Sequence, residues 1–167
     1  MIKRIAFVFL LALPACLMAQ QKEFCSGIDM LVQAAPAGFK TVKDSIVKIN
    51  EKGIVWACKV SVPGVITGRI ISVMGLRYEG ALFQSRNLAE VQQAYEKYKG
   101  FLNGCLLDKG YVLSYGDNFY PGLEAYKKLV YMSTKDDAPT PPPHVSVETD
   151  YSKQTGAYTI VLYVWQH

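Results

Sequence analysis

The sequence predicts an α+β domain in which a mainly antiparallel sheet of about six to seven strands carries two helices on one face. Two observations predict this class. Segments with the apolar repeat of a helix occur twice, and each is followed by several short segments of strand character. The expected order is one helix, three to four strands, a second helix and three to four strands.

The chain begins with the pattern of a secretory signal peptide, residues 1–19. Lys3 and Arg4 precede an apolar run that ends at Pro14, and a zone of small residues follows. This run is far shorter than the ~20 residues of a permanent transmembrane helix. Cleavage after Ala19 would leave residues 20–167 as a single α+β domain without a transmembrane helix.

The same segment also resembles the signal of a bacterial lipoprotein. Leu13-Pro-Ala-Cys16 has the form of a lipobox, in which Cys16 would carry the lipid, although Pro14 departs from the small or β-branched residue usual there. Both alternatives place the chain outside the cytoplasm, and the lipoprotein alternative tethers it to a membrane. None of the four Asn lies in an Asn-x-Ser/Thr sequon, which favours a bacterial periplasm over a eukaryotic secretory route.

Three cysteines remain in the domain, so an oxidising compartment predicts one disulfide and one thiol. Cys58 lies in a predicted strand on the face of Trp56 and suits a small buried side chain. Cys25–Cys105 is therefore the favoured pair, with Cys58–Cys105 as the alternative. These cysteines and the two His show no ligand pair at short spacing, so no metal or other cofactor is predicted.

The first helix is predicted to begin at Ser26, which with Asp29 has the form of a helix start, and to end before Pro36. Turn signals then separate four apolar, strand-like segments. These segments are residues 46–49, 54–62, 65–74 and 76–84.

The second helix is predicted from the cap at Asn87 to Gly110. Its apolar residues recur at steps of three and four and form one face. Gly100 and Gly104 fall on the opposite side, although an interior Gly costs up to about 1 kcal/mol relative to Ala. This strip is interpreted as a docking surface for a partner or another helix, or as the packing site of the first helix.

The remaining strands are expected at 111–115, 128–133, 145–151 and 157–165. The last is apolar on both faces, and one of these faces carries Tyr163 and Trp165. Tyr115 and Tyr131 could extend that face. The pattern is interpreted as an aromatic surface for a ligand or a partner protein, or as ordinary core.

A second binding candidate is the loop that begins at Tyr115. It combines aromatic rings with polar groups and glycines, a composition found in recognition loops, although the same residues favour simple turns. Its candidate binding residues are Tyr115, Asp117, Asn118, Phe119 and Tyr120.

The sequence contains no pattern that indicates catalysis or nucleic-acid binding. No nucleophile-elbow, zinc-protease or phosphate-loop motif is present. The carboxylate pairs Asp136–Asp137 and Glu148/Asp150 are interpreted as surface charge. The basic residues are spread along the chain, which argues against a nucleic-acid partner.

The sequence therefore predicts a non-catalytic binding or protein-interaction module outside the cytoplasm. Its partner would be another envelope or secreted protein, or a small ligand, and an inhibitor or immunity-like role fits its size. Two alternatives stay open: a small extracytoplasmic hydrolase that uses carboxylates, and a lipid-tethered structural protein of the envelope.

Overall fold

The computed structural model describes residues 3–73, 75–118, 123, 126–134 and 142–166, with side chains from Met18 onward. It confirms the α+β class. Within the described residues it contains two α-helices and one antiparallel sheet of eight strands, slightly more than the six to seven expected. The elements in chain order are α1 (Lys3–Ala34), β1 (Lys43–Asn50), β2 (Gly53–Cys58), β3 (Thr67–Ser72), β4 (Leu76–Ser85), α2 (Leu88–Leu106), β5 (Tyr111–Gly116), β6 (Lys128–Ser133), β7 (His144–Ser152) and β8 (Ala157–Trp165).

The sheet consists of two four-stranded meanders joined side by side. The strand order is β1-β2-β3-β4-β8-β7-β6-β5, so the last strand of each meander lies in the centre. Each meander follows its own helix, and the two halves of the chain therefore have the same order of elements. The centre is a long antiparallel pairing of β4 with β8, in which Glu79 lies opposite Tyr163.

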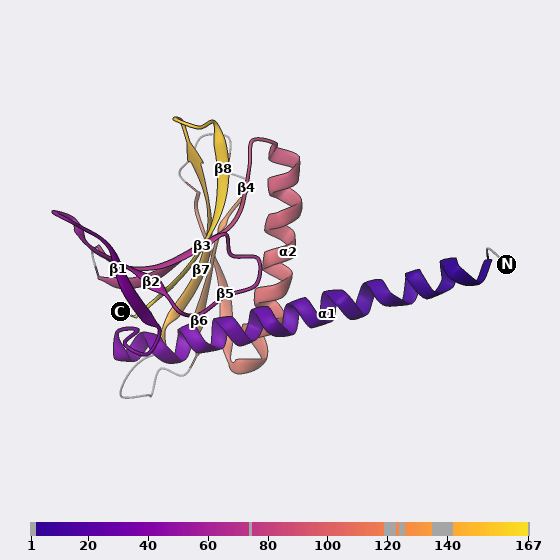
Figure 1. Ribbon diagram of the computed structural model, residues 1–167, viewed down its shortest axis with the longest axis horizontal. Helices are drawn as coiled ribbons and strands as arrows, with labels where there is room; N and C mark the ends of the chain where they lie inside the picture. The colour runs from indigo at the N-terminus through magenta and orange to yellow at the C-terminus, as the bar shows by residue number, and fades with distance from the viewer. Residues whose placement is uncertain (1–2, 74, 119–122, 124–125, 135–141, 167) are drawn as a thin grey trace.

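The second helix covers one face of the central strands (Figure 1). The Asn87 side chain caps it by accepting a hydrogen bond from the Ala89 amide at 3.0 Å. On its buried face, the Tyr98 hydroxyl donates to the Leu82 carbonyl at 3.0 Å, which fastens α2 to β4. The main core lies between this face and the strands, which is the arrangement that the apolar repeat of α2 predicts.

The first helix is much longer than expected and crosses α2 near the C-terminal end of α2 (Figure 1). The predicted start at Ser26 is wrong because the preceding Ala, Leu, Met, Gln, Lys and Glu residues also favour a helix and nothing interrupts it there. Among the described side chains of α1, burial begins at Phe24. The part of α1 before this point projects beyond the sheet (Figure 1).

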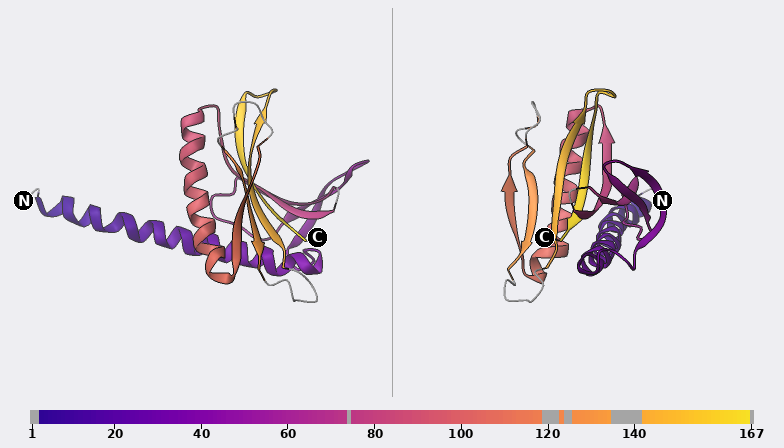
Figure 2. Two further views of the ribbon diagram at one scale, coloured as in Figure 1. Left: turned by 180° about the vertical axis from the view of Figure 1, so that it is seen from behind. Right: turned by 90° about the vertical axis from the view of Figure 1, so that its left-hand side faces the viewer.

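Cys25 of α1 and Cys105 of α2 form a disulfide, the pairing favoured from the sequence. Cys58 keeps a free, half-buried thiol. At the far edge of the sheet, the hairpin of β1 and β2 extends away from the body of the domain (Figures 1 and 2).

Candidate functional site: the open face of the sheet

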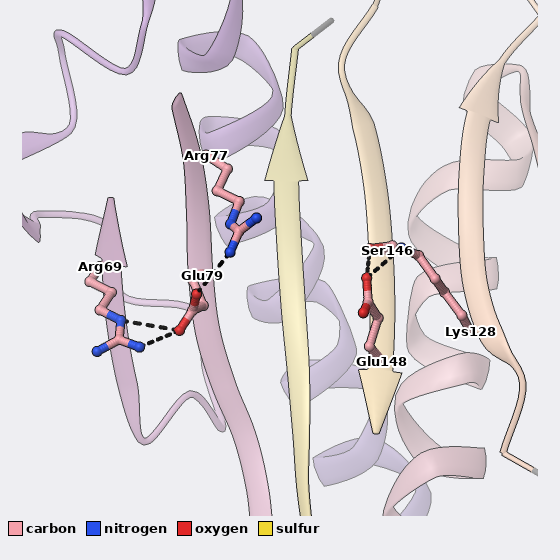
Figure 3. A network of polar contacts seen from close by, with 6 residues as sticks. All are labelled: Arg69, Arg77, Glu79, Lys128, Ser146 and Glu148. Atoms are coloured by element: carbon pink, nitrogen blue, oxygen red, sulfur yellow. Dashed lines mark hydrogen bonds and ion pairs between the residues drawn. The ribbon is translucent and has the colours of Figure 1, made fainter. Parts of the chain in front are cut away.

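Neither of the two described helices covers one face of the central strands. Seen from this side, α2 lies behind the sheet (Figure 2, right), and the helices also lie behind the strands in the close-up (Figure 3). We call this surface, formed by β3, β4, β8, β7 and β6, the open face. Because residues opposite each other in antiparallel strands share a face, the register decides which side chains meet on it.

The register brings charged residues of two strands, β3 and β4, beside the aromatic residues of β8. Glu79 lies between Arg69 of β3 and Tyr163 of β8. In the next row, Arg77 lies opposite Trp165. The side chains of the open face therefore come from segments that are distant in the sequence.

Glu79 is the centre of one polar network on this face (Figure 3). Arg69 donates to its Oε1 from Nε at 3.2 Å and also from a terminal nitrogen of the guanidinium. Arg77 contacts the other oxygen in a long ion pair of 3.7 Å. Glu79 is thus held mainly by Arg69, and Arg77 is only weakly engaged.

A second network lies across β6 and β7 (Figure 3). Lys128 forms an ion pair of 2.6 Å with Glu148, and the buried Ser146 hydroxyl donates to the same carboxylate oxygen at 3.4 Å. These contacts fix Glu148 in place beside the centre of the sheet.

The two networks border a hollow of about 640 Å³. Cations lie against aromatic rings in it: the Arg77 guanidinium is 5.1 Å from the centre of the Tyr163 ring, and the Lys128 ammonium is 5.8 Å from that of Trp165. The residues that line the hollow are Gly75, Leu76, Arg77, Lys128, Glu148, Tyr163, Trp165 and Gln166. Partly exposed aromatic rings beside cations give this surface both apolar area and directed charge.

Burial and neighbouring charges shift the pKa values of two groups on the open face, Asp150 and Tyr163. Burial raises the pKa of Asp150, and the carboxylates of Glu148 and Glu79 raise it further. Burial also raises the pKa of Tyr163, with Asp150 as the largest of the charge contributions. The Tyr163 hydroxyl is therefore protonated at neutral pH and remains a hydrogen-bond donor.

The structure divides the predicted aromatic surface between the two faces of the sheet. Tyr163 and Trp165 lie on the open face, whereas Tyr131 is fully buried on the helix face and donates to Asn103 Oδ1 at 2.8 Å. Tyr115 pairs with the buried Leu129 and so also points to the helix side, where it is largely exposed. Only Tyr163 and Trp165 of this set belong to the candidate site.

The described residues of the predicted recognition loop are held in place by contacts with neighbouring residues. Asp117 forms an ion pair of 2.7 Å with Lys127, which lowers the pKa of its carboxyl. The Asn118 amide donates to the carbonyls of Tyr126 and Thr149 at 3.1 and 2.9 Å. The loop candidates Phe119 and Tyr120 and the acidic pair 136–137 lie outside the described residues.

The two glycines of the α2 strip have different surroundings. A Cβ added at Gly100 would meet open space, whereas one at Gly104 would meet the Gln21 side chain of α1. The first helix therefore packs beside Gly104. Cys16 lies in the projecting part of α1, where only the backbone is described.

Four charged residues of the open face were not predicted from the sequence: Arg69, Arg77, Glu79 and Lys128. Their chemistry depends on which residues lie opposite each other, and register between distant strands is not visible in local patterns. The alternation of Arg77 and Glu79 along β4 was the one available signal.

No group of three or more His, Cys, Asp or Glu side chains in the described part of the chain could hold a metal ion. None of the helices in that part is long and apolar enough to cross a membrane. Comparisons with family models, curated proteins and solved structures find no match for this chain. Its function must therefore be argued from the open face itself.

Proposed function

We propose that this protein is a secreted binding module that holds another protein through the open face of its sheet. The observation that carries this proposal is the hollow around Tyr163 and Trp165, with Arg77 and Lys128 at its border. Trp, Tyr and Arg are the residue types that most often dominate the affinity of protein interfaces. A rigid central sheet also presents them at little cost in conformational entropy.

Arg77 gives the expected partner a chemical character. Its closest carboxylate, Glu79, lies 3.7 Å away and is already held by Arg69. Its side chain is 38% exposed, so a partner can reach the guanidinium from outside. A guanidinium in this state favours a carboxylate that can accept two parallel hydrogen bonds, so we expect the partner to insert an Asp or Glu side chain.

The test is capture of the partner from extracytoplasmic extracts by the tagged protein, followed by titration of the two purified proteins. We expect one partner to bind stoichiometrically, and we expect Trp165→Ala and Arg77→Gln each to raise Kd by roughly 10- to 30-fold, the range of an interface hot spot. Thermal unfolding of each variant establishes that it is folded.

Two matched variants serve as controls. Lys153→Gln removes an exposed cation from the turn between β7 and β8, and Tyr115→Ala removes an exposed aromatic ring from the helix side. Both should leave Kd unchanged. A partner whose affinity is insensitive to Trp165 and Arg77, or equally sensitive to the controls, would place the interface elsewhere.

Asp150 supports a second candidate function, hydrolysis by paired carboxyl groups. An acid whose pKa is raised beside ionised carboxylates has the character of the general acid in glycosidases, and Glu148 and Glu79 are its charged neighbours. Turnover of chromogenic glycosides and cell-wall fragments that Asp150→Asn abolishes, and Asp44→Asn leaves intact, would favour this candidate. Absence of turnover in the wild-type protein would remove it.

The proposed secretion is supported by the N-terminal pattern and by the place of burial in α1. Phe24 is the first buried side chain described in this helix. Removal of residues 1–19 would therefore take away most of the projecting part of α1 and leave the disulfide at Cys25 in place.

A further inference from the structure

A row of apolar side chains begins in the core and ends on the β1–β2 hairpin, where the side chains are exposed to solvent. In the register of β1, β2 and β3, Ile46 lies opposite Trp56, and Trp56 lies opposite Ile70. Ile70 is 0% exposed, Trp56 is half-buried and Ile46 is 54% exposed. The apolar layer on the helix side of the sheet therefore continues onto the hairpin, where it loses its cover.

The exposed apolar surface of the hairpin comprises more than one side chain. Ile49 lies opposite Ile54, and both share the face of Ile46 and Trp56. Ile49 is 67% exposed, and the neighbouring Val47 is 65% exposed. Single exposed apolar residues are common, but a contiguous group on a projecting hairpin indicates a contact surface.

Positive charge predominates in the segment that contains this apolar surface. Between residues 40 and 59 the sequence has five lysines and only two acidic residues. None of these lysines takes part in an ion pair within the described residues. The Lys43 ammonium lies 4.0 Å from the centre of the Trp56 ring, so one cation lies directly on the apolar face.

Two kinds of occupant fit this surface poorly. The register of β1 against β2 shifts twice, between Lys43 and Ile46 and between Ile46 and Lys48. Such bulges blunt the outer edge of a strand, which disfavours the addition of another strand. A second copy of this chain would bring the same lysines together, and like charges would repel.

We propose that the β1–β2 hairpin docks on an anionic lipid bilayer. Ile46, Ile49 and Trp56 would enter the boundary between headgroups and acyl chains, and the flanking lysines would contact the headgroups. A bilayer fits better than a protein, because a few aliphatic side chains cannot supply the roughly 800 Å² per partner of a standard interface. Each lysine near an anionic membrane adds about fivefold to the affinity, so a small apolar surface suffices.

The test is cosedimentation of the protein isolated from the extracytoplasmic fraction with two kinds of vesicle. One contains phosphatidylcholine alone, and the other also contains phosphatidylglycerol. We expect binding to the second kind only. The double variant Ile46→Ser and Ile49→Ser should weaken this binding about tenfold or more, since the apolar contact is lost. Lys48→Gln with Lys52→Gln should weaken it and reduce its dependence on salt.

Ile66→Ser and Val112→Ser are the matched controls, because both side chains are exposed but lie outside the hairpin. They should bind as the wild type does. Equal binding of the double variant and the wild type would overturn the proposal. In that case a lipid on Cys16 or another surface, and not the hairpin, would cause the binding. Failure of the wild type to bind anionic vesicles would also overturn it, as would a photo-crosslinker at position 49 that captures only protein.

Discussion

Tyr78 lies fully buried in β4, and its hydroxyl occupies the space that a side chain would need at two glycines. Gly68 of β3 and Gly80 of β4 lie opposite each other, and a Cβ added to either would come within 2.7 Å of Tyr78 Oη. These positions therefore require glycine for the close approach of the ring, not for an unusual backbone conformation.

We expect Gly80→Ala to lower the free energy of unfolding by about 1–3 kcal/mol, because the buried Tyr78 ring cannot move aside without strain. Gly100→Ala is the matched control: the added Cβ meets open space, and the substitution removes a helix-interior Gly. It should raise the free energy of unfolding by up to about 1 kcal/mol. Urea unfolding measures both, and similar values for the two variants would contradict this account.

The partly buried position of Asp150 gives a pH-dependent prediction. Its folded-state pKa is raised above the ordinary value, so the folded state holds the proton more tightly than the unfolded state does. Its contribution to stability is therefore present below pH ~4 and is lost as pH rises through the folded-state pKa. Asp150→Asn should raise stability relative to the wild type near pH 7 but not near pH 3.5.

Urea unfolding of wild type and Asp150→Asn across this pH range measures the effect. Asp44→Asn, in the edge strand β1, is the control, since Asp44 is exposed. An Asp150→Asn variant that is destabilised near pH 7 but not near pH 3.5 would contradict the raised pKa, because this pattern belongs to a carboxylate that the fold stabilises in its charged form.

At the level of elements, the disulfide ties α1 to α2 across 80 residues of sequence. By the chain-entropy argument, closing a loop of this size stabilises the folded state by about 4 kcal/mol. The double variant Cys25→Ala and Cys105→Ala should lower the free energy of unfolding by about that amount in urea. The remaining contacts of α1 would then have to hold it on the domain.

Cys58→Ala is the control for the loss of a cysteine without the loss of a crosslink. Burial raises the pKa of the Cys58 thiol, so we expect it to stay protonated and slow to react at neutral pH. A double variant that is no less stable than Cys58→Ala would show that the disulfide constrains little in the unfolded chain.

The second helix and the strand-rich order were predictable from sequence, because the repeat of α2 and the alternation of the strands are local signals. The face of the sheet on which each tyrosine lies could not be predicted. Tyr131 and Tyr163 look alike in their segments, yet Tyr131 pairs with Val145 on the helix face and Tyr163 with Glu79 on the open face. Only the long-range register separates them, since a shift by one residue exchanges the faces of a strand.

At the level of the whole molecule, the secreted form gives a further prediction. The protein isolated from the extracytoplasmic fraction should have the intact mass of a chain that begins at Gln20, since the projecting part of α1 precedes the first buried residue described in this helix. A lipid-modified chain beginning at Cys16 would instead support the lipoprotein alternative. A mass that includes residues 1–19 would contradict both.

The order of the elements also has a topological consequence. Residues 25 to 105 form a covalent ring closed by the disulfide, and this ring contains the whole first meander and nearly all of α2. Arg86 lies exposed in the short connection between β4 and α2, inside that ring. A single tryptic cut after Arg86 would therefore open the ring without separating its parts, and the halves should part on a gel only after reduction.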